Sequence, residues 1–383
     1  LRFLNLRNCK SLKSLPSSIR LPSLEKLNLS KCSKLEKFPE ICSNLETLDL
    51  ENCTSLVEVH SSVGILTKLR FLNLRNCKSL KSLPSSIRLP SLEKLNLSNC
   101  SKLENFPEIC GGVKFLEKLH GDGTALKELP SSIEHLTSLL SINLSNCKSL
   151  TSLPETICHL KCLKTLILSG CSKLDNLPPN LGDMECLEEL HVDGTAITEP
   201  PSSIGHLRNL KILSFSESNM FDGALPDDLS NLSSLEELNL SGNNFVKLPE
   251  SINRLSRLEV LVLDGCKTLE ALPTLPSNIA QLYADGCQSL KLLADLSTNN
   301  KLVTVSFTNC LKLSQIEQSE NMTDMLLQCM LQAVQASLDF HKKYSVFVPG
   351  TEIPQWFSHQ KLGHSISIQL PPHWFRKNLM GFA

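Results

Sequence analysis

The cysteines and histidines of this chain have the spacing that comes nearest to a reactive or metal-binding site. The segment Cys158-His159-Leu160-Lys161-Cys162 places two thiols around one imidazole. Thiolate sulfur and imidazole nitrogen are common zinc ligands, but a zinc site of this kind normally contains a paired CxxC. The segment lacks that pair, so we expect both cysteines to be packing residues and His159 to lie at the surface.

The chain contains 16 cysteines and 10 histidines, which could supply a Cys–His nucleophile pair. Thiols held in an apolar turn have a raised pKa and react poorly. The sequence has no GxSxG or HExxH motif and no pair of carboxylates in a catalytic context. We therefore expect no enzyme activity, no cofactor and no metal. Ten of the cysteines recur at one position of a repeated motif: Cys9, Cys32, Cys53, Cys77, Cys100, Cys147, Cys171, Cys266, Cys287 and Cys310.

The repeated motif reads LxxLxLxxCxxLxxLPxxI and has a period of about 23 residues, which is typical of a leucine-rich repeat. Residues 69–110 duplicate residues 1–42, with only Lys31/Asn99 and Lys37/Asn105 different. One repeat buries too little apolar surface to fold alone, so neighbouring repeats must stack into a solenoid. The predicted fold class is an α/β leucine-rich-repeat solenoid of about 14 repeats, followed by a helix and a partial β-sandwich.

Each repeat is predicted to contribute one strand, in which leucines at spacings of three and then two point inward. The LP pair that follows lies on the return path. Proline there predicts a short turn or 3₁₀ segment and no second ladder strand. The repeat from Leu45 has His60 instead and is predicted to carry a helical turn. The strands begin near Leu1, Leu24, Leu45, Leu69, Leu92, Leu116, Leu139, Leu163, Leu187, Leu210, Leu235, Leu258, Ile279 and Leu302.

The repeat cysteines would lie about one sheet spacing, ~4.8 Å, from one another. Disulfides would have to pair them arbitrarily, so we interpret them as buried free thiols, which are typical of a reducing compartment. The net charge of −1 argues against nucleic acid and anionic membranes as partners. No apolar run reaches membrane-spanning length. These features predict a cytoplasmic protein, with the nucleus as an alternative.

The repeat pattern ends after Cys310. We predict a solenoid over 1–313, a linker and capping helix over 314–343, and the start of a β-sandwich over 344–383. Apolar residues at helical spacing within 318–343 predict a helix that covers the last repeat near Leu302. Strands are expected at 344–348, 365–370 and 379–383.

The outward strand positions form the concave face of a solenoid and are the predicted protein-binding surface, above all between Leu116 and Leu263. Outward apolar residues, including Ile167, suggest a partner-binding patch. Reversing the charge of the acidic members is expected to weaken recognition. The candidate residues are Lys118, His120, Asp122, Glu189, His191, Asp193, Ile212, Val260, Val262 and Tyr283.

Three passages together resemble a known family: the cysteine-type repeat with LPSSI, LPTLPSNIAQLYADGCQSL, and VPGTEIPQWFSHQKLGHSISIQLPPHWF. They are similar to the repeat and post-repeat regions of plant intracellular immune receptors that carry a Toll/interleukin-receptor-like domain and a nucleotide-binding domain. The resemblance covers the whole chain and implies a jelly-roll-like post-repeat domain. The matching post-repeat motif consists of Pro349, Gly350, Glu352, Ile353, Pro354, Trp356, Phe357, His359 and Gly363.

The resemblance implies recognition of a protein, either a pathogen effector or a host target, in the defence response. The nucleotide-binding domain of the parent receptor is a further implied partner. The sequence contains no GxxxxGK[ST], so ATP or ADP binding does not carry over to these residues. The pairs Trp356-Phe357 and Trp374-Phe375 could anchor a partner, but we favour the interpretation that they are core residues of the β-domain.

Two other classes of protein remain open. One is a leucine-rich-repeat adaptor or scaffold, for instance a substrate-recruiting subunit, unrelated to immunity. Residues upstream of Leu1 would separate it from a receptor, because a receptor would show a nucleotide-binding domain there. The other is an enzyme, which a single hyper-reactive cysteine would indicate.

Overall fold

The computed structural model describes residues 1–226, 228–293, 296, 299, 301–313 and 345–347. The chain divides into two compact units, Leu1–Leu235 (unit 1) and Glu236–Ala383 (unit 2). The predicted domain boundaries near 313 and 344 flank a stretch outside the described residues. The predicted helix within 318–343, the strands at 365–370 and 379–383, and the post-repeat motif also lie outside them.

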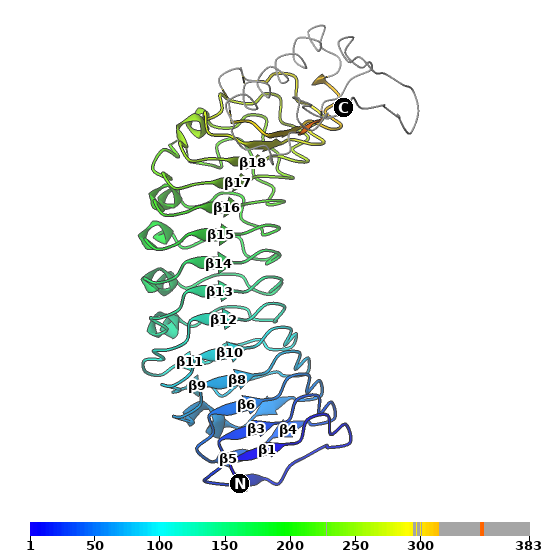
Figure 1. Ribbon diagram of the computed structural model, residues 1–383, viewed down its shortest axis with the longest axis vertical. Coiled ribbons are helices and arrows are strands. Elements are labelled where there is room, and N and C mark those ends of the chain that lie inside the picture. Colours follow the sequence, from blue (N-terminus) through cyan, green and yellow to red (C-terminus); the bar gives the residue numbers. More distant parts are fainter. Residues whose placement is uncertain (227, 294–295, 297–298, 300, 314–344, 348–383) are drawn as a thin grey trace, which may run out of the picture. The chain divides into compact units, whose positions relative to one another are not determined.

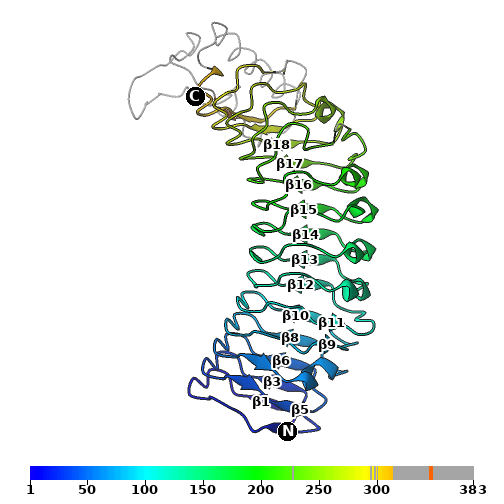
Figure 2. The ribbon, with the colours of Figure 1, turned by 180° about the vertical axis from the view of Figure 1, so that it is seen from behind.

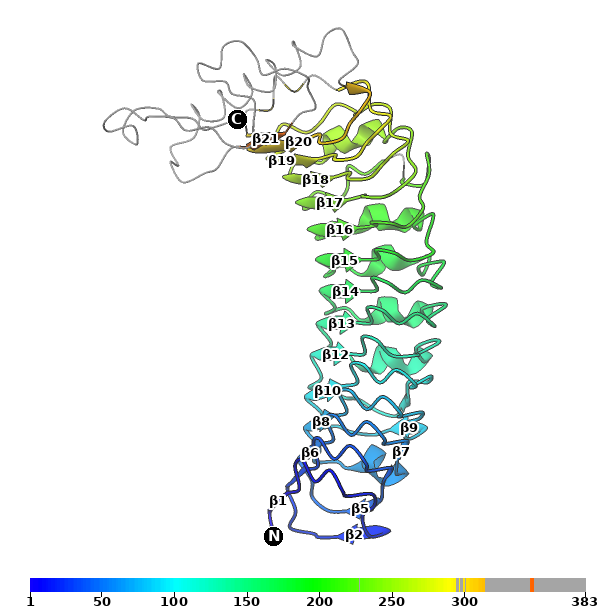
Figure 3. The ribbon, with the colours of Figure 1, turned by 90° about the vertical axis from the view of Figure 1, so that its right-hand side faces the viewer.

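Unit 1 is built on a parallel sheet whose strands follow one another in chain order (Figure 1). Every strand has three residues, and neighbours pair in register, as in Leu95↔Leu119. Figure 3 shows these strands along one edge of the unit and the return path along the other. The strands are β1 (Phe3–Asn5), β3 (Lys26–Asn28), β6 (Thr47–Asp49), β8 (Phe71–Asn73), β10 (Lys94–Asn96), β12 (Lys118–His120), β13 (Ser141–Asn143), β14 (Thr165–Ile167), β15 (Glu189–His191) and β16 (Ile212–Ser214).

Unit 2 has the same construction, with β17 (Glu237–Asn239), β18 (Val260–Val262), β19 (Gln281–Tyr283), β20 (Thr304–Ser306) and β21 (Ser345–Phe347). The ten strands of unit 1 and the first four of unit 2 are those that the leucine pattern predicts, so the predicted repeat strands are confirmed. The strand predicted at 344–348 is also present as β21. It pairs in parallel with β20, through Thr304↔Ser345 and Ser306↔Phe347, and thus extends the sheet of the repeats.

The leucine spacing explains why these segments form strands. In the second repeat Leu24, Leu27 and Leu29 are fully or almost fully buried, while Lys26 between them is exposed. Side chains alternate across a strand, so the spacing of two residues between Leu27 and Leu29 keeps both in the core. Burying such a leucine stabilises the fold by about 2 kcal/mol. A single repeat would not gain this free energy, because the neighbouring repeats supply the surfaces that bury the side chain.

The return path takes a 3₁₀ form in several repeats, as the proline predicts. Pro130, Pro154, Pro201 and Pro249 each directly precede a 3₁₀ helix, and His60 does the same in the repeat from Leu45. Figure 2 shows the helices of unit 1 beside the stacked strands. The helices of unit 1 are η1 (Ser61–Ile65), η2 (Ser131–His135), η3 (Glu155–His159), η4 (Leu181–Asp183) and η5 (Ser202–His206), and unit 2 contains η6 (Glu250–Arg254).

Every helix in the described residues is 3₁₀, so the α/β assignment is corrected to a β-solenoid with few helices. The short return path explains the difference. Only eight residues separate Pro130 from Leu139, the first inward residue of the next repeat. A stable α-helix needs more turns than this length allows, whereas a 3₁₀ helix is normally used in short pieces.

The prediction that proline excludes a second ladder strand is wrong in the first repeats. Short return strands pair in parallel there: β2 (Ser18–Arg20) with β5 (Glu40–Cys42), β4 (Lys37–Phe38) with β7 (Glu58–Val59), and β9 (Ser86–Ile87) with β11 (Glu108–Ile109). Proline is compatible with these strands because it lies outside them, where no ladder N–H is required: Pro39 lies between β4 and β5, and Pro107 directly precedes β11. The repeat that contains β7 has His60 at the proline position.

The repeat cysteines lie in the turn after each strand and form a ladder of hydrogen bonds. The Cys53 thiol donates to the carbonyl oxygen of Leu29 in the preceding repeat at 3.2 Å, and Cys100 donates to that of Leu74 at 3.1 Å. Where cysteine is replaced, another donor serves a turn carbonyl: the Thr124 hydroxyl donates to Gly121 and the Asn243 amide to Leu240, both at 2.8 Å. A small donor at this position therefore adds a hydrogen bond to a buried turn carbonyl that also accepts from another donor, as Leu29 does from the Cys32 N–H and Leu74 does from the Cys77 N–H.

Burial is confirmed for nine of the ten repeat cysteines, while Cys9 is exposed. Burial raises the pKa of the Cys53 and Cys100 thiols to about 12 and that of Cys266 to about 11. A hydrogen bond to Cys147, together with burial, raises the pKa of Cys171. All the cysteines that the structure describes are free thiols. The thiols whose pKa is raised are thus protonated at neutral pH, whereas hydrogen bonds with Cys171 and Thr124 lower the pKa of Cys147 to about 7 and one with Cys287 lowers the pKa of Cys310.

The residue before each ladder position has a left-handed backbone, a regularity that the sequence analysis missed. Asn99 (φ 61°) and Asn146 (φ 60°) are followed one repeat later by Gly123 (φ 66°) and Gly170 (φ 78°). A Cβ at Gly170 would come within 2.7 Å of the Asn146 side-chain oxygen. Asparagine and glycine tolerate this backbone region best. The alternation of Asn and Gly before cysteine was the available sequence signal.

Candidate protein-binding face

We define the outward face as the strand residues on either side of each central buried residue, together with the residue two positions after each strand. In-register pairing arranges the strand residues of unit 1 in two rows. Across β12 to β16 the first row is Lys118, Ser141, Thr165, Glu189 and Ile212. The second row is His120, Asn143, Ile167, His191 and Ser214.

The predicted residues of unit 1 fall into two groups on this face. Lys118 and His120 are exposed on β12, whereas Glu189, His191 and Ile212 are half-buried on the adjacent strands β15 and β16. Two further strands separate the groups, which at the usual strand spacing corresponds to about 14 Å. They can contact one protein surface together, but they cannot form a single small-molecule site.

The predicted residues of unit 2 are adjacent to one another. Val260 and Val262 are half-buried on β18, and Val262 pairs in register with Tyr283 of β19. The Tyr283 hydroxyl donates to the Gln281 side-chain oxygen at 3.0 Å. Phe347 of β21 lies in the same row, opposite Ser306, and is 54% exposed. We refer to Val262, Tyr283 and Phe347 of this row, together with Val260 of the adjacent row, as the apolar row.

Phe347 is a candidate binding residue that the sequence analysis missed. The strand that contains it was predicted, but it was assigned to a separate β-sandwich, so its side chain was not counted on the face of the repeats. Its parallel pairing with β20 places it there. The available signal was that 345–347 could extend the alternating pattern of the preceding strands.

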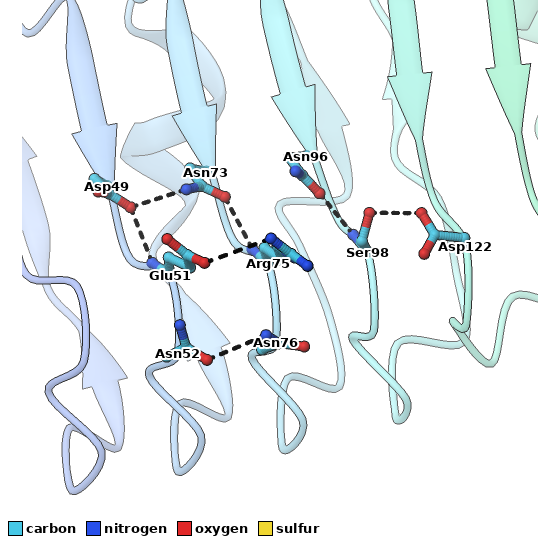
Figure 4. A network of polar contacts seen from close by, with 9 residues as sticks. All are labelled: Asp49, Glu51, Asn52, Asn73, Arg75, Asn76, Asn96, Ser98 and Asp122. Carbon is cyan, nitrogen blue, oxygen red and sulfur yellow. Dashed lines mark hydrogen bonds and ion pairs between the residues drawn. The ribbon is translucent and has the colours of Figure 1, made fainter.

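In the first repeats the polar groups of the outward face bind one another (Figure 4). An Asp49 carboxylate oxygen accepts hydrogen bonds from the Glu51 backbone N–H and the Asn73 side-chain amide, both at 3.1 Å. The Asn73 side-chain oxygen accepts from the Arg75 N–H at 3.2 Å. Burial raises the pKa of Asp49. Two further groups, Asn52 with Asn76 and Asn96 with Ser98 and Asp122, are bonded in the same way. We refer to the residues of these three groups as the polar network: Asp49, Glu51, Asn52, Asn73, Arg75, Asn76, Asn96, Ser98 and Asp122.

Two of the predicted acidic residues also hold the sheet together. The Ser98 hydroxyl donates to Asp122 at 2.6 Å. Asp193 accepts from the Ser169 hydroxyl at 2.9 Å, from the Ser216 backbone N–H at 2.9 Å, and from the Ser214 hydroxyl. Reversing either charge would therefore disturb the scaffold as well as any interface, so Glu189 is the cleaner acidic probe of the three.

One ion triad lies beside the outward face. The Glu188 carboxylate contacts the ammonium groups of Lys164 and Lys211, each at 2.7 Å. Hydrogen bonds from both lysines hold the pKa of Glu188 at about 2. The triad links three consecutive repeats at the entrance to their strands, and the Glu188 carboxylate stays ionised throughout the physiological pH range.

The geometry also bears on the alternative sites raised by the sequence. Cys158 is buried on η3, while Cys162 is exposed in the following turn, so the two thiols do not converge. His159 contacts Glu134 at 2.6 Å. Within the described part of the chain, no group of three or more His, Cys, Asp or Glu side chains could hold a metal ion. No helix in that part is long and apolar enough to cross a membrane.

Family models agree with the repeat architecture. The model described as "Disease resistance protein RPS4B-like, leucine-rich repeats" matches residues 88–316, and a general leucine-rich-repeat model matches residues 23–45. The C-JID domain model matches residues 348–383, the segment that holds the post-repeat motif. In structure, the chain is similar to a leucine-rich-repeat protein of Leptospira interrogans, with a TM-score of 0.54 at 24% identity over 86% of this chain and 95% of that one. This likeness concerns the fold alone.

Similar sequences are found among plant resistance proteins. Disease resistance-like protein DSC1 of Arabidopsis thaliana is 40% identical over 93% of this chain and 32% of its own length. TMV resistance protein N of Nicotiana glutinosa is 36% identical over 95% of this chain and 34% of its own. The chain thus spans about a third of these relatives. Repeat pattern, solenoid and family matches agree: the chain belongs to the RPS4B-like disease resistance leucine-rich-repeat family, as the repeat and post-repeat region of such a protein.

Proposed function

We propose that this chain is the recognition region of an intracellular plant immune receptor. Its outward face binds a protein ligand, either a pathogen effector or a host protein that an effector targets. The post-repeat motif at 349–363 is proposed to take part in the same recognition. The chain has no catalytic role in this proposal, it acts in the cytoplasm or nucleus, and its other partner is the nucleotide-binding domain of the parent receptor.

The apolar row is the observation that carries this proposal. Val260 and Val262 on one strand, Tyr283 on the next and Phe347 on β21 gather apolar and aromatic side chains. Other apolar residues of the outward face, such as Phe71, Ile167 and Ile212, stand singly among polar neighbours. Aromatic and aliphatic anchors of this kind are typical of protein interfaces. Within unit 1, taken by itself, the charged residues Lys118 and Glu189 on β12 and β15 are proposed to speed the encounter with a protein partner.

An exchange of regions tests this function. Residues 1–383 replace the matching region of a full-length relative such as TMV resistance protein N, and the chimaera is expressed in leaves with a panel of pathogen effectors. We expect cell death with an effector to which the recipient receptor does not respond. The unmodified recipient is the control. A chimaera that accumulates normally but keeps the response pattern of the recipient would contradict recognition by this chain.

A further inference from the structure

Cys162 and Cys186 occupy equivalent turns of two consecutive repeats. Each is the third residue of a four-residue turn, closed by a hydrogen bond from the Leu163 N–H to the Leu160 carbonyl and from the Leu187 N–H to the Met184 carbonyl, both at 3.0 Å. Both cysteines are exposed free thiols. They differ in this from the ladder cysteines and belong to no site described above.

The register of the sheet places these two turns side by side. Cys162 and Cys186 each precede a strand by three residues, and the strands β14 and β15 pair in register through Thr165↔Glu189. Adjacent parallel strands lie ~4.8 Å apart. Disulfides join cysteines whose Cα atoms are about 4.4–6.8 Å apart. The backbone spacing therefore suits a direct bridge between the two turns.

Other repeats show the direction in which a side chain points from this turn position. In the next repeat the Asn209 side-chain amide donates to the carbonyl oxygen of Glu185 at 2.8 Å. Ser138 and Asn44 reach the equivalent carbonyls of their own preceding repeats, Lys114 at 2.8 Å and Pro22 at 3.0 Å. The third turn position thus points toward the preceding repeat, which for Cys186 is the turn that contains Cys162.

Side chains at this position also contact one another across repeats. Lys301 and Asn278 are each the residue before the first inward residue of a repeat, and the Lys301 ammonium donates to the Asn278 side-chain oxygen at 2.6 Å. Side chains at the third turn position of adjacent repeats can therefore contact each other directly. Lysine, however, is longer than cysteine. For two cysteines the short backbone spacing makes up for the shorter side chains.

We propose that Cys162 and Cys186 form a thiol–disulfide exchange site that closes into a bridge between neighbouring repeats. With oxidised glutathione as co-reactant, one cysteine thiolate attacks the glutathione disulfide and releases one reduced glutathione. The second cysteine thiolate then attacks the protein sulfur of the mixed disulfide and releases the other. The protein loses two protons and two electrons, and one glutathione disulfide becomes two glutathione thiols.

The bridge would fix two turns next to Thr165 and Glu189, at the entrance to the outward face. It would reduce the relative movement of two repeats there while leaving the buried ladder untouched. The dithiol is thus a redox-sensitive modification site, and its existence does not depend on the proposed recognition function.

Cys42 and Cys110 provide matched controls within the same chain, because both are exposed thiols. In the preceding repeat, the residue opposite Cys42 is Arg20, with which it pairs in register. The Cys110 N–H donates to the carbonyl of Ile87, next to Arg88. Neither cysteine therefore has a thiol opposite it in the preceding repeat. The two cysteines should therefore accept glutathione without forming a bridge to that repeat.

The experiment treats the folded chain with oxidised glutathione, blocks free thiols, and maps the products by non-reducing digestion and mass spectrometry. We expect a Cys162–Cys186 linked peptide, and stable glutathione adducts on Cys42 and Cys110. In C162S, Cys186 should instead retain one glutathione, and in C186S, Cys162 should retain one. Glutathione retained on both Cys162 and Cys186 of the unaltered chain would overturn the proposal. So would their failure to link under conditions in which Cys42 and Cys110 react.

Discussion

The polar network of unit 1 and the apolar row of unit 2 are built on the same strand geometry but differ in chemistry. In the first, Asp49, Asn73 and Arg75 direct their polar groups at one another and at the backbone. In the second, Val262 and Tyr283 occupy equivalent positions and offer apolar surface. The comparison teaches that the inward leucines and the turn ladder define a strand geometry on which either outward chemistry can be built, polar groups that bind one another or exposed apolar groups.

The two regions therefore have different consequences for binding. A polar group that already has a partner on its own sheet gains little by exchanging it for one on a ligand. An apolar side chain at the surface gains by being covered, by about 25 cal/mol for each Å² removed from water. This difference is why we propose that the apolar row takes part in recognition and that the polar network has a structural role.

The largest effect is expected from alkaline pH, which acts on the ladder that both regions share. Burial raises the pKa of Cys53 to about 12 and that of Cys266 to about 11 from an ordinary value of 9.0. The unfolded thiols ionise first, so stability is full below pH 9 and falls as the pH rises toward 11 or 12. Each unit of pKa difference corresponds to about 1.4 kcal/mol.

Urea unfolding followed between pH 8 and pH 11 measures this loss. Both units should weaken over the same interval, because each contains ladder thiols with raised pKa values. Stability that stays constant above pH 9, in either unit, would show that its ladder is not protonated and buried as described.

The second test compares the central leucines beneath the two regions. Leu95 of β10 and Leu261 of β18 are almost completely buried. Substitution by alanine, Leu95→Ala or Leu261→Ala, should cost about 3 kcal/mol in either case, because each leaves a cavity in the same kind of core. Chemical denaturation measures the loss. A much smaller cost at Leu261 would mean that the scaffold beneath the apolar row differs from that beneath the polar network.

The third test separates the outward residues themselves. Asp49→Ala removes the acceptor for two hydrogen bonds and should destabilise the chain by about 1–2 kcal/mol. Asp49→Asn is the matched control and should be nearly neutral, since Asn28 and Asn73 already occupy this position in neighbouring repeats. Val262→Thr in the apolar row should change thermal unfolding little. If Asp49→Ala were as neutral as Asp49→Asn, the polar network would have no structural role.

The smallest effect is expected at the ion triad, which belongs to neither region. The Glu188 carboxyl should titrate at a pKa of about 2, and in Lys164→Met or Lys211→Met it should move up toward its ordinary value of 4.5. Stability from this group is present above pH 4.5 and is lost as the pH falls toward 2. Carboxyl NMR shifts measure the titration. An unmoved pKa in both variants would exclude the lysines as its cause.

The sequence predicted the repeat strands because leucine spacing, which is a local signal, decides which side chains enter the core. The short strands on the return path were not predicted. They depend on pairing between repeats and on the few residues available after each proline, as at Pro39 and β5. The 3₁₀ rather than α-helical character follows from the same limit on length.

The candidate face was only partly readable from sequence. Lys118, Glu189 and Val262 do lie on it, because the alternation of strand residues is a local property. The structural role of Asp193 was not foreseen, since its hydrogen bonds come from the neighbouring repeats. Phe347 was also missed, because its place depends on pairing with a strand about forty residues earlier.

The most direct test of the central claim compares the two regions in the same full-length chimaeric receptor, with an effector to which it responds. Val260→Glu with Val262→Glu places two charges in the apolar row, while Lys26→Glu with Lys94→Glu changes two exposed charges on strands of the first repeats. Equal protein accumulation is the control. The account predicts that the first pair abolishes effector-triggered cell death and that the second leaves it intact. If only the second pair, Lys26→Glu with Lys94→Glu, abolished the cell-death response, the result would contradict this account.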